Sequence, residues 1–273
     1  MVRINDIFTV WRGLRPRSLF CLDVLWHGRI KTNSLFLYTF NGKVRLYSRA
    51  FTDDKWPVVE VILSNIYEHE KFYKFSSAPV IVDIGAHIGS FVIPQAQRWP
   101  AATIVAVEAM PQTCEILQLN LNINNCSNVK VVPRAVAAHV GEIVLGTSFC
   151  KTMANTRFSA STLVGGITHT IPAVTLSSLI IENDLQHIDW LKMDIEGSEF
   201  EVIRTVPNEM WQRIANISLE YHLLKPEDRA EQLIEIFKQA GFELLEHKKL
   251  SSVLGILKWR QQKEPQTTNA VLK

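Results

Sequence analysis

The amino-acid sequence predicts an α/β fold in which a mainly parallel sheet is covered by helices on both faces. From Pro79 onward, short β-branched segments alternate with helix-like segments, as in successive βαβ units. The first of these segments, residues 80–82, is apolar without interruption, which is typical of a strand buried on both faces. A chain of 273 residues is long enough to bury a large core of this kind.

Residues 1–75 have a different pattern, and we expect them to form an extension that covers the active site. An Asn-Gly pair at 41–42 lies between two strand-like segments, which predicts a β-hairpin with a two-residue turn. An Asp-Asp pair at 53–54, followed by apolar residues at helical spacing, predicts a capped amphipathic helix. No repeat or flexible linker separates this part from the rest, so we expect one domain.

The main domain is assigned to residues 76–260, and its elements follow one another in a regular order. Strands are expected at 80–82, 104–107, 129–132, 190–193, 217–219, 242–246 and 253–259. Helices are expected at 90–99, 111–124 and 226–240, with Gly241 as the C-cap of the last. The final residues, 261–273, are expected to be a disordered tail.

One connection, residues 134–188, is longer than a simple strand-to-helix link. It contains a further strand-like segment at 142–145 and a helix-like segment at 176–183. Insertions of this length commonly lie over a ligand site. We therefore expect it to border the opening of the pocket.

Composition excludes several classes of protein. Lys and Arg total 29 against 27 Asp and Glu, a net charge of +2, which argues against a nucleic-acid partner held by a basic surface. No apolar run approaches the ~18–20 residues that cross a bilayer, and residues 1–11 lack the apolar core of a secretory signal. Four cysteines without paired spacing are expected to be reduced thiols, so a cytoplasmic location is predicted (Cys21, Cys114, Cys126 and Cys150).

The most specific segment is Val-Asp-Ile-Gly-Ala-His-Ile-Gly at 82–89, directly after the first parallel strand. Gly85 permits a sharp turn and Gly89 a close backbone approach, at the sheet edge where open α/β folds bind ligands. The spacing D-x-G-x-x-x-G differs from the dinucleotide fingerprint G-x-G-x-x-G. It suits S-adenosylmethionine, which has no phosphate. Glu108 ends the next strand, where its carboxylate can accept hydrogen bonds from ribose hydroxyls, and Met110 can pack on the adenine.

Polar side chains gather at the ends of two later strands. Asp194 and Glu196 are two residues apart and can point the same way, as can Glu220 and His222. Such a set can act as a general base, bind substrate hydroxyls or hold a divalent metal. No metal is predicted, because no second histidine has ligand spacing. The alternatives are a helix N-terminus for the first pair and an ordinary loop histidine for His222.

Four segments together resemble FkbM-type methyltransferases: residues 82–89, Val-Glu-Ala at 107–109, Leu-Lys-Met-Asp-Ile-Glu-Gly-Ser-Glu at 191–199, and Leu-Glu-Tyr-His at 219–222. The resemblance covers roughly residues 60–245. It implies a seven-stranded class I (Rossmann-like) fold and S-adenosylmethionine-dependent methylation, commonly of hydroxyls on sugars or natural products. The cofactor residues it implies, together with those inferred above, are Asp83, Gly85, Ala86, His87, Gly89, Glu108, Ala109, Met110, Ala135 and Val136.

The chain departs from the family pattern at several positions. His87 stands where the family often has asparagine, and Arg134 precedes Ala135 where a small polar residue is usual. Pro94 falls early in the expected helix 90–99, where it can distort the first turns. Residues 1–50 match no known pattern, and we expect substrate choice to depend on them and on residues 146–172.

We therefore expect transfer of a methyl group to a hydroxyl of a sugar, lipid or natural product, that is, a small-molecule or glycan acceptor. His222 is the expected general base, because a neutral imidazole accepts a proton near pH 7. Asp194 or Glu220 would orient it, and Glu196 would bind substrate. The alternatives are a nicotinamide-dependent oxidoreductase on a related Rossmann fold and a non-catalytic cofactor-binding module. Methylation of a nucleic acid is disfavoured, since Asp-Ile-Glu-Gly replaces the Asp-Pro-Pro-Tyr motif of amine methylation.

Overall fold

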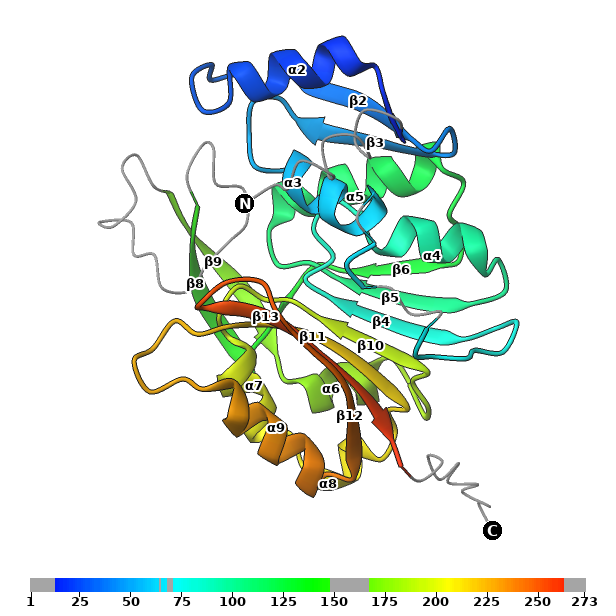
Figure 1. Ribbon diagram of the computed structural model, residues 1–273, viewed down its shortest axis with the longest axis vertical. Helices are drawn as coiled ribbons and strands as arrows, with labels where there is room; N and C mark the ends of the chain where they lie inside the picture. Colours follow the sequence, from blue (N-terminus) through cyan, green and yellow to red (C-terminus); the bar gives the residue numbers. More distant parts are fainter. Residues whose placement is uncertain (1–12, 64, 68–70, 148–166, 263–273) are drawn as a thin grey trace.

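A seven-stranded sheet forms the centre of the computed structural model, which describes residues 13–63, 65–67, 71–147 and 167–262. Its strand order is β12-β13-β11-β10-β4-β5-β6 (Figure 1). Only β13 runs antiparallel to the others. The predicted mixed, mainly parallel sheet is therefore confirmed. The strands are β4 (Val80–Ile84), β5 (Thr103–Val107), β6 (Val129–Val132), β10 (Trp190–Met193), β11 (Asn216–His222), β12 (Phe242–Lys249) and β13 (Leu254–Gln261).

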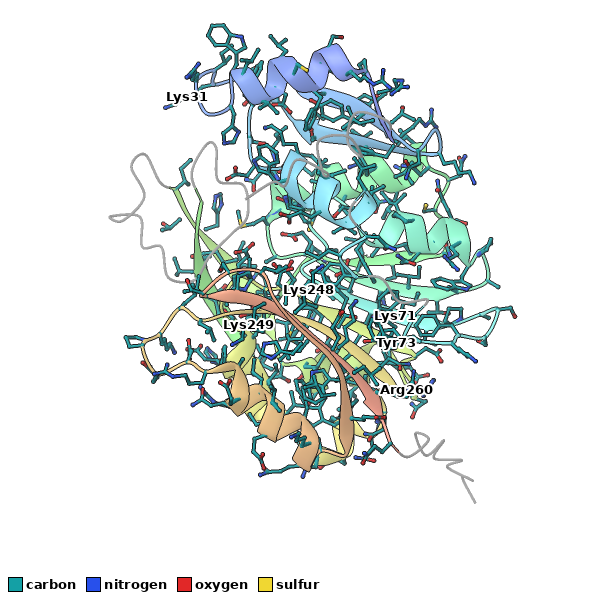
Figure 2. All side chains as sticks on the ribbon, in the orientation of Figure 1. Lys31, Lys71, Tyr73, Lys248, Lys249 and Arg260 are labelled. Atoms are coloured by element: carbon teal, nitrogen blue, oxygen red, sulfur yellow. The ribbon has the colours of Figure 1, made fainter. Side chains whose placement is uncertain are left out.

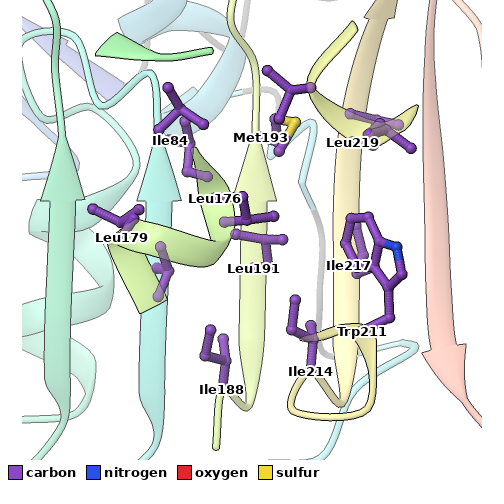
Figure 3. Packing of buried hydrophobic residues seen from close by; sticks show 14 of the residues in the cluster. Ile84, Leu176, Leu179, Ile188, Leu191, Met193, Trp211, Ile214, Ile217 and Leu219 are labelled. Carbon is purple, nitrogen blue, oxygen red and sulfur yellow. The ribbon is translucent and has the colours of Figure 1, made fainter. Parts of the chain in front are cut away.

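Helices cover both faces of this sheet, as the uninterrupted apolar strands require. Val82 and Leu191 point into one core and Ile81 and Trp190 into the other, because successive strand residues face opposite sides. The first core, drawn in Figure 3, packs under α6 (Leu176–Glu182), α7 (Glu199–Thr205), α8 (Asn208–Trp211) and α9 (Ala230–Gln239). The second packs under α4 (Val92–Arg98), α5 (Pro111–Ile123) and the N-terminal extension.

The N-terminal extension contains the predicted hairpin, formed by β2 (Leu35–Phe40) and β3 (Val44–Arg49). Phe40 pairs with Val44, so the loop is 41–43, one residue longer than the predicted two-residue turn; Asn41 and Gly42 have the positive φ angles typical of such a turn, 49° and 68°. The sequence did not predict β1 (Leu14–Arg15), which pairs with β2, or α2 (Arg17–Leu25). The hairpin shares a hydrophobic core with α4 and α5, so the extension packs as part of the main body (Figure 1).

Residues 55–63 form a helix, as predicted, but no side chain caps its first turn. A single turn, α3 (Lys55–Val58), continues into a π-helical turn, η1 (Val59–Leu63). Asp54 occupies the N-cap position without capping, because its carboxylate accepts hydrogen bonds from Arg49 instead. The expectation of an aspartate cap is therefore wrong for Asp54, because its carboxylate pairs with the Arg49 guanidinium of β3.

Residues 71–79, which lead into β4, pass the amino-terminal ends of β10 and β11. Tyr73 donates its hydroxyl proton to the carbonyl of Ile217, 2.7 Å away, and Arg260 of β13 donates to the carbonyl of Phe72 (Figure 2). Phe75 stacks on Trp190, with ring centroids 5.5 Å apart. These contacts fasten the extension to β10, β11 and β13.

The long connection forms a second small sheet of order β7-β9-β8. It comprises β7 (Ala135–Val136), β8 (Gly141–Thr147) and β9 (Ile167–Val174), and the predicted strand 142–145 lies inside β8. The predicted helix 176–183 corresponds to α6. Residues 148–166, most of the segment to which we assign substrate choice, lie outside the described residues, as does Cys150.

Two helix boundaries and one tail boundary differ from the prediction. Helix α4 begins at Val92, so Pro94 is its third residue, where a helix needs no backbone N–H donor and proline causes no break. Helix α9 begins at Ala230, four residues later than expected, and Gly241 follows its C-cap with a φ of 87°. Strand β13 extends to Gln261, the first residue of the expected tail; residues 263–273 lie outside the described part. No helix among the described residues has the length and apolar character of a membrane span.

Candidate active site

A pocket opens at the carboxyl ends of β4, β5 and β10. Together with the solvent at its mouth it encloses about 880 Å³. Five parts of the chain line it: the loop after β4, the end of β5, the end of β10 with the loop that follows it, the small sheet of the insertion, and the N-terminal extension. Of the predicted cofactor residues, the lining includes Gly85, Ala86, His87, Glu108, Ala109, Ala135 and Val136.

Gly85 turns the chain from β4 into this pocket. Its φ of 82° lies in the left-handed region, and a β-carbon at this position would be 1.8 Å from the backbone oxygen of Asp194. No side chain fits there, so the loops after β4 and β10 approach each other only because residue 85 is glycine. This contact brings the two predicted sites, the cofactor loop and the Asp-Ile-Glu-Gly segment, together.

Gly89 has a different role from the predicted approach to a ligand. It is not among the residues that line the pocket, and a β-carbon there would lie 2.8 Å from Ile93 and 2.9 Å from Leu117. The glycine therefore lets the loop after β4 pack against α4 and α5. Met110 is also absent from the lining and packs in the small apolar cluster formed with the insertion.

Glu108 is held by backbone donors on both carboxylate oxygens. The N–H of His87 donates to one oxygen and the N–H of Met110 to the other, each over 2.9 Å. The side chain is 8% exposed and borders the pocket. A carboxylate fixed in this way keeps its remaining lone pairs for ligand donors, which is the arrangement that a ribose diol requires.

Asp83 lies beneath the pocket and not in its wall. It is fully buried and pairs with Lys192, its neighbour across β4 and β10, over 3.0 Å. Burial raises the pKa of Asp83, although the Lys192 ammonium opposes this. Lys192 also donates to the carbonyl of Gly85 over 2.9 Å. Lys192 was not predicted from the sequence. It contacts both Asp83 and the carbonyl of Gly85, and it borders the pocket.

Tyr67, another residue missed from the sequence, comes from the N-terminal extension. Its hydroxyl donates to Glu220 over 2.8 Å and lies 3.4 Å from Asp194, and its ring lies 5.6 Å from the Lys192 ammonium. Tyr67 is 3% exposed and borders the pocket. Burial and the charge of Glu220 raise its pKa well above the usual value, so the hydroxyl keeps its proton.

The Asp-Ile-Glu-Gly segment forms a tight loop organised by Glu199. The buried Glu199 carboxylate accepts hydrogen bonds from the N–H groups of Ile195 and Gly197, over 3.2 and 3.1 Å. Glu196 and Gly197 both have left-handed φ angles, 55° and 107°. Helix α7 starts only at Glu199, so Asp194 and Glu196 are loop residues that border the pocket and do not belong to a helix N-terminus.

His222 is held by the same carboxylate. Its Nδ1 lies 3.0 Å from Glu199 Oε1, and its Nε2 lies 3.5 Å from Glu196 Oε2. Burial disfavours the charged imidazole, but the hydrogen bond and charge of Glu199 outweigh it and raise the pKa to about 10. His222 therefore carries a proton at pH 7. The neutral imidazole assumed in the sequence analysis does not match this site.

Two carboxylates of the site have pKa values raised toward neutrality. Burial and the nearby Asp194 charge raise the pKa of Glu196 to about 7. The same two causes raise the pKa of Glu220 to about 8. Groups with pKa values near 7 are those best suited to exchange protons with a substrate at neutral pH.

Asp194, Glu220 and His222 also satisfy a simple distance test for a metal site. Within the described part of the chain, their potential ligand atoms all lie within 4.8 Å of one another. A cation there would compete with the Tyr67 hydroxyl for oxygens of Glu220 and Asp194. The prediction that the site uses no metal stays a prediction.

The far wall of the pocket comes from the insertion. Ala135 and Val136 of β7 line it together with Ile143 and Leu145 of β8, which gives an apolar surface suited to an adenine ring. Arg134 also borders the pocket, but its guanidinium pairs with Glu182 over 2.7 Å. The departure from the family pattern at Arg134 therefore leaves the apolar wall intact.

The fold and the pocket define a class I methyltransferase: a seven-stranded sheet with a pocket at the carboxyl ends of β4 and β5, where open α/β sheets bind their ligands. The family model of the methyltransferase FkbM domain matches residues 83–244, more than half of the chain. The protein therefore belongs to the FkbM family of S-adenosylmethionine-dependent methyltransferases.

Curated relatives agree with this assignment. The chain is 27% identical to methyltransferase sdnD of Sordaria araneosa over 201 residues, covering 62% of this chain and 75% of that protein. It is 25% identical to methyltransferase 1 of Beauveria bassiana over 179 residues, covering 59% and 70%.

Among solved structures, the similarity is more distant. The FkbM methyltransferase of Methylobacillus flagellatus is 16% identical, with a TM-score of 0.46 and coverage of 75% of this chain and 53% of that one. TYW2 of P. horikoshii in complex with MeSAdo is also 16% identical, with a TM-score of 0.46 and coverage of 84% and 72%.

Proposed function

We propose that this methyltransferase acts on a hydroxyl group of a small-molecule or glycan acceptor, such as a sugar, a lipid or a natural product. The observation that carries the proposal is the group of proton-exchanging side chains beside the cofactor pocket. Glu196 borders the pocket, lies 3.5 Å from His222 and has a pKa raised to about 7. A hydroxyl needs such a base, because its oxygen becomes a good nucleophile only as its proton leaves.

The residues of the pocket fit S-adenosylmethionine. Glu108 would accept hydrogen bonds from the ribose hydroxyls, and the insertion wall at Ala135 and Val136 would pack on the adenine. Gly85, Ala86 and His87 would lie along the middle of the cofactor. S-adenosylmethionine supplies an electrophilic methyl group on a sulfonium. The carboxylates of Asp194 and Glu196 border the same pocket and favour a positive charge there.

We assign proton removal to Glu196 and not to His222, which reverses the expectation from sequence. The Glu199 carboxylate keeps His222 protonated, so the imidazolium is a fixed positive charge beside Glu196. It would stabilise Glu196 as a carboxylate when the acceptor is in place, and Glu196 would take the hydroxyl proton as the oxygen attacks the methyl carbon. Asp194 and Glu220 would hold neighbouring hydroxyls of the acceptor.

The acidic side chains around Glu196 support a neutral or cationic acceptor. Four acidic side chains, Asp194, Glu196, Glu199 and Glu220, surround two basic ones, Lys192 and His222; Glu196 and Glu220, with pKa values raised to about 7 and 8, add to the negative charge as the pH rises through this range. A phosphate-bearing acceptor would be repelled, which agrees with the predicted absence of a nucleic-acid partner. The predicted cytoplasmic location is part of this proposal; its support is that Cys21, Cys114 and Cys126 are free thiols.

The experiment is a screen of acceptors with methyl-labelled S-adenosylmethionine, in which neutral sugars, amino sugars and hydroxylated lipids are compared with their phosphorylated forms. We expect the label in a methyl ether, identified by mass spectrometry and NMR, and only with unphosphorylated acceptors. Label on nitrogen or carbon would contradict O-methylation. Tight cofactor binding with no transfer to any acceptor would favour the non-catalytic alternative.

A further inference from the structure

A buried aspartate of the N-terminal extension contacts the cofactor loop. Asp54 is fully buried and accepts two hydrogen bonds from the Arg49 guanidinium, over 2.8 and 2.9 Å. Its Oδ1 also lies 3.1 Å from Nε2 of His87. Burial favours the neutral acid, but His87 and Arg49 together hold the pKa of Asp54 well below its usual range. The carboxylate is therefore charged and paired on two sides.

His87 in turn holds the residue that we assign to the ribose. Its backbone N–H donates to Glu108 over 2.9 Å, and it does so from a left-handed conformation with a φ of 51°. That conformation is strained for a residue with a β-carbon. In this conformation the His87 imidazole lies beside the Asp54 carboxylate, and their contact offsets part of the strain.

Arg49 extends the connection to the other side of Glu108. One of its nitrogens donates to Thr113 Oγ1 over 3.1 Å. Thr113 is in the first turn of α5, and the second backbone donor to Glu108, Met110, is the N-cap of that helix. The Arg49–Asp54 pair thus contacts both of the segments whose N–H groups fix the Glu108 carboxylate.

We propose that Asp54 is a positioning residue for the cofactor site and acts through His87. The N-terminal extension then does more than cover the pocket, since it sets the conformation of the loop that orients Glu108. The histidine at position 87, where the family often has asparagine, is explained as the partner of Asp54. This inference rests on the proposed cofactor pocket.

The test is a double-mutant cycle on S-adenosylmethionine affinity, measured by isothermal titration calorimetry. His87→Asn removes the imidazole but keeps a residue type that tolerates a positive φ, and it leaves the Asp54–Arg49 pair in place. Asp54→Asn removes the charge. We expect each single variant to bind S-adenosylmethionine at least about fivefold more weakly than the wild type. The double variant should have the affinity of whichever single variant binds more weakly, because the effects of coupled residues do not add.

Asp53→Asn is the matched control. Asp53 is the adjacent residue, and its carboxylate pairs with His27 over 3.3 Å, away from the cofactor loop. It should bind S-adenosylmethionine as the wild type does. Thermal unfolding of each variant separates lost stability from lost affinity; if Asp54→Asn fails to fold, Asp54→Glu, which keeps the charge but displaces the carboxylate, takes its place in the cycle with His87→Asn.

The outcomes separate this inference from the proposed function. Unchanged affinity in His87→Asn, or additive losses in the double variant, would overturn the role of Asp54 while leaving the pocket assignment in place. Absence of S-adenosylmethionine binding by the folded wild-type protein would overturn the pocket assignment and this inference together.

Discussion

The carbonyl oxygen of Asp194 occupies the place that a side chain of residue 85 would need. A β-carbon on Gly85 would lie 1.8 Å from that oxygen, so the turn after β4 and the loop after β10 fit together only with glycine. The cofactor pocket and the acceptor side of the site meet at this contact. The contact explains why a glycine follows the first parallel strand, and no phosphate-binding role is needed to explain it.

Replacement of Gly85 by alanine should abolish cofactor binding. The added methyl group would push the two loops apart, and alanine disfavours a φ of 82°. Gly42→Ala is the control, because Gly42 has a similar φ of 68° but nothing within 4 Å of its β-carbon position. Gly42→Ala should cost about 1 kcal/mol of stability and leave S-adenosylmethionine affinity unchanged. Equal binding by both variants would refute the contact's role.

Glu196→Gln should lower kcat by about 10²- to 10⁴-fold, the usual contribution of a general base. The dissociation constant for S-adenosylmethionine should change little. The rise of kcat with increasing pH around pH 7, which reports loss of the Glu196 proton, should disappear. His222→Asn is the comparison. If His222 were the base, Glu196→Gln would retain most activity and His222→Asn would lose it.

Stability should fall as the pH rises from about 4.5 to 10. The folded pKa of Glu220 is raised from 4.5 to about 8 and that of His222 from 6.5 to about 10. A raised folded pKa means that the folded state binds the proton more tightly, so this stabilisation is present below the unfolded pKa and is lost as the pH passes the folded one.

A glutamine at position 220 tests this dependence. Glu220→Gln mimics the protonated acid, so its melting temperature at pH 9 should exceed that of the wild type and the difference should shrink at pH 4. Glu209→Gln, on the exposed surface of α8, should leave the curve unchanged. A wild-type melting temperature that rises between pH 6 and 9 would contradict the assignment.

Lys192→Met should destabilise the fold by about 3–5 kcal/mol, because it leaves the fully buried Asp83 without its positive partner. Urea unfolding measures this loss. The double variant Lys192→Met with Asp83→Asn should recover much of it, since no buried charge then remains. Additive destabilisation in the double variant would show that the two residues act independently.

Much of the fold follows from local signals in the sequence. Uninterrupted apolar runs predicted the central strands, because both faces of each are covered by helices. The Asn-Gly pair predicted the hairpin turn, since few residue pairs accept two positive φ angles. Helix α2 was not predicted, because its residue buried in the core is Asp23 while Leu22 and Leu25 are exposed.

The candidate site was only partly accessible from sequence. Lys192 carried an overlooked signal, because a lysine within an apolar strand is buried only with a partner. Tyr67 carried none: it reaches Glu220, 153 positions away, only through the packing of the extension. The protonation of His222 depends on Glu199, which is 23 positions away in the sequence and is buried by the loop it organises.

The central claim is that the pocket beside Glu108 binds S-adenosylmethionine for methyl transfer, and calorimetric titration tests it most directly. S-adenosylmethionine and NAD⁺ would each be titrated into the wild type, into Glu108→Ala, and into Glu115→Ala as an exposed control on α5. The pocket predicts one S-adenosylmethionine site in the wild type and the control, weakened about 10- to 100-fold in Glu108→Ala, since hydrogen bonds to a charged group are lost. Tighter binding of NAD⁺, or S-adenosylmethionine affinity that does not depend on Glu108, would contradict it.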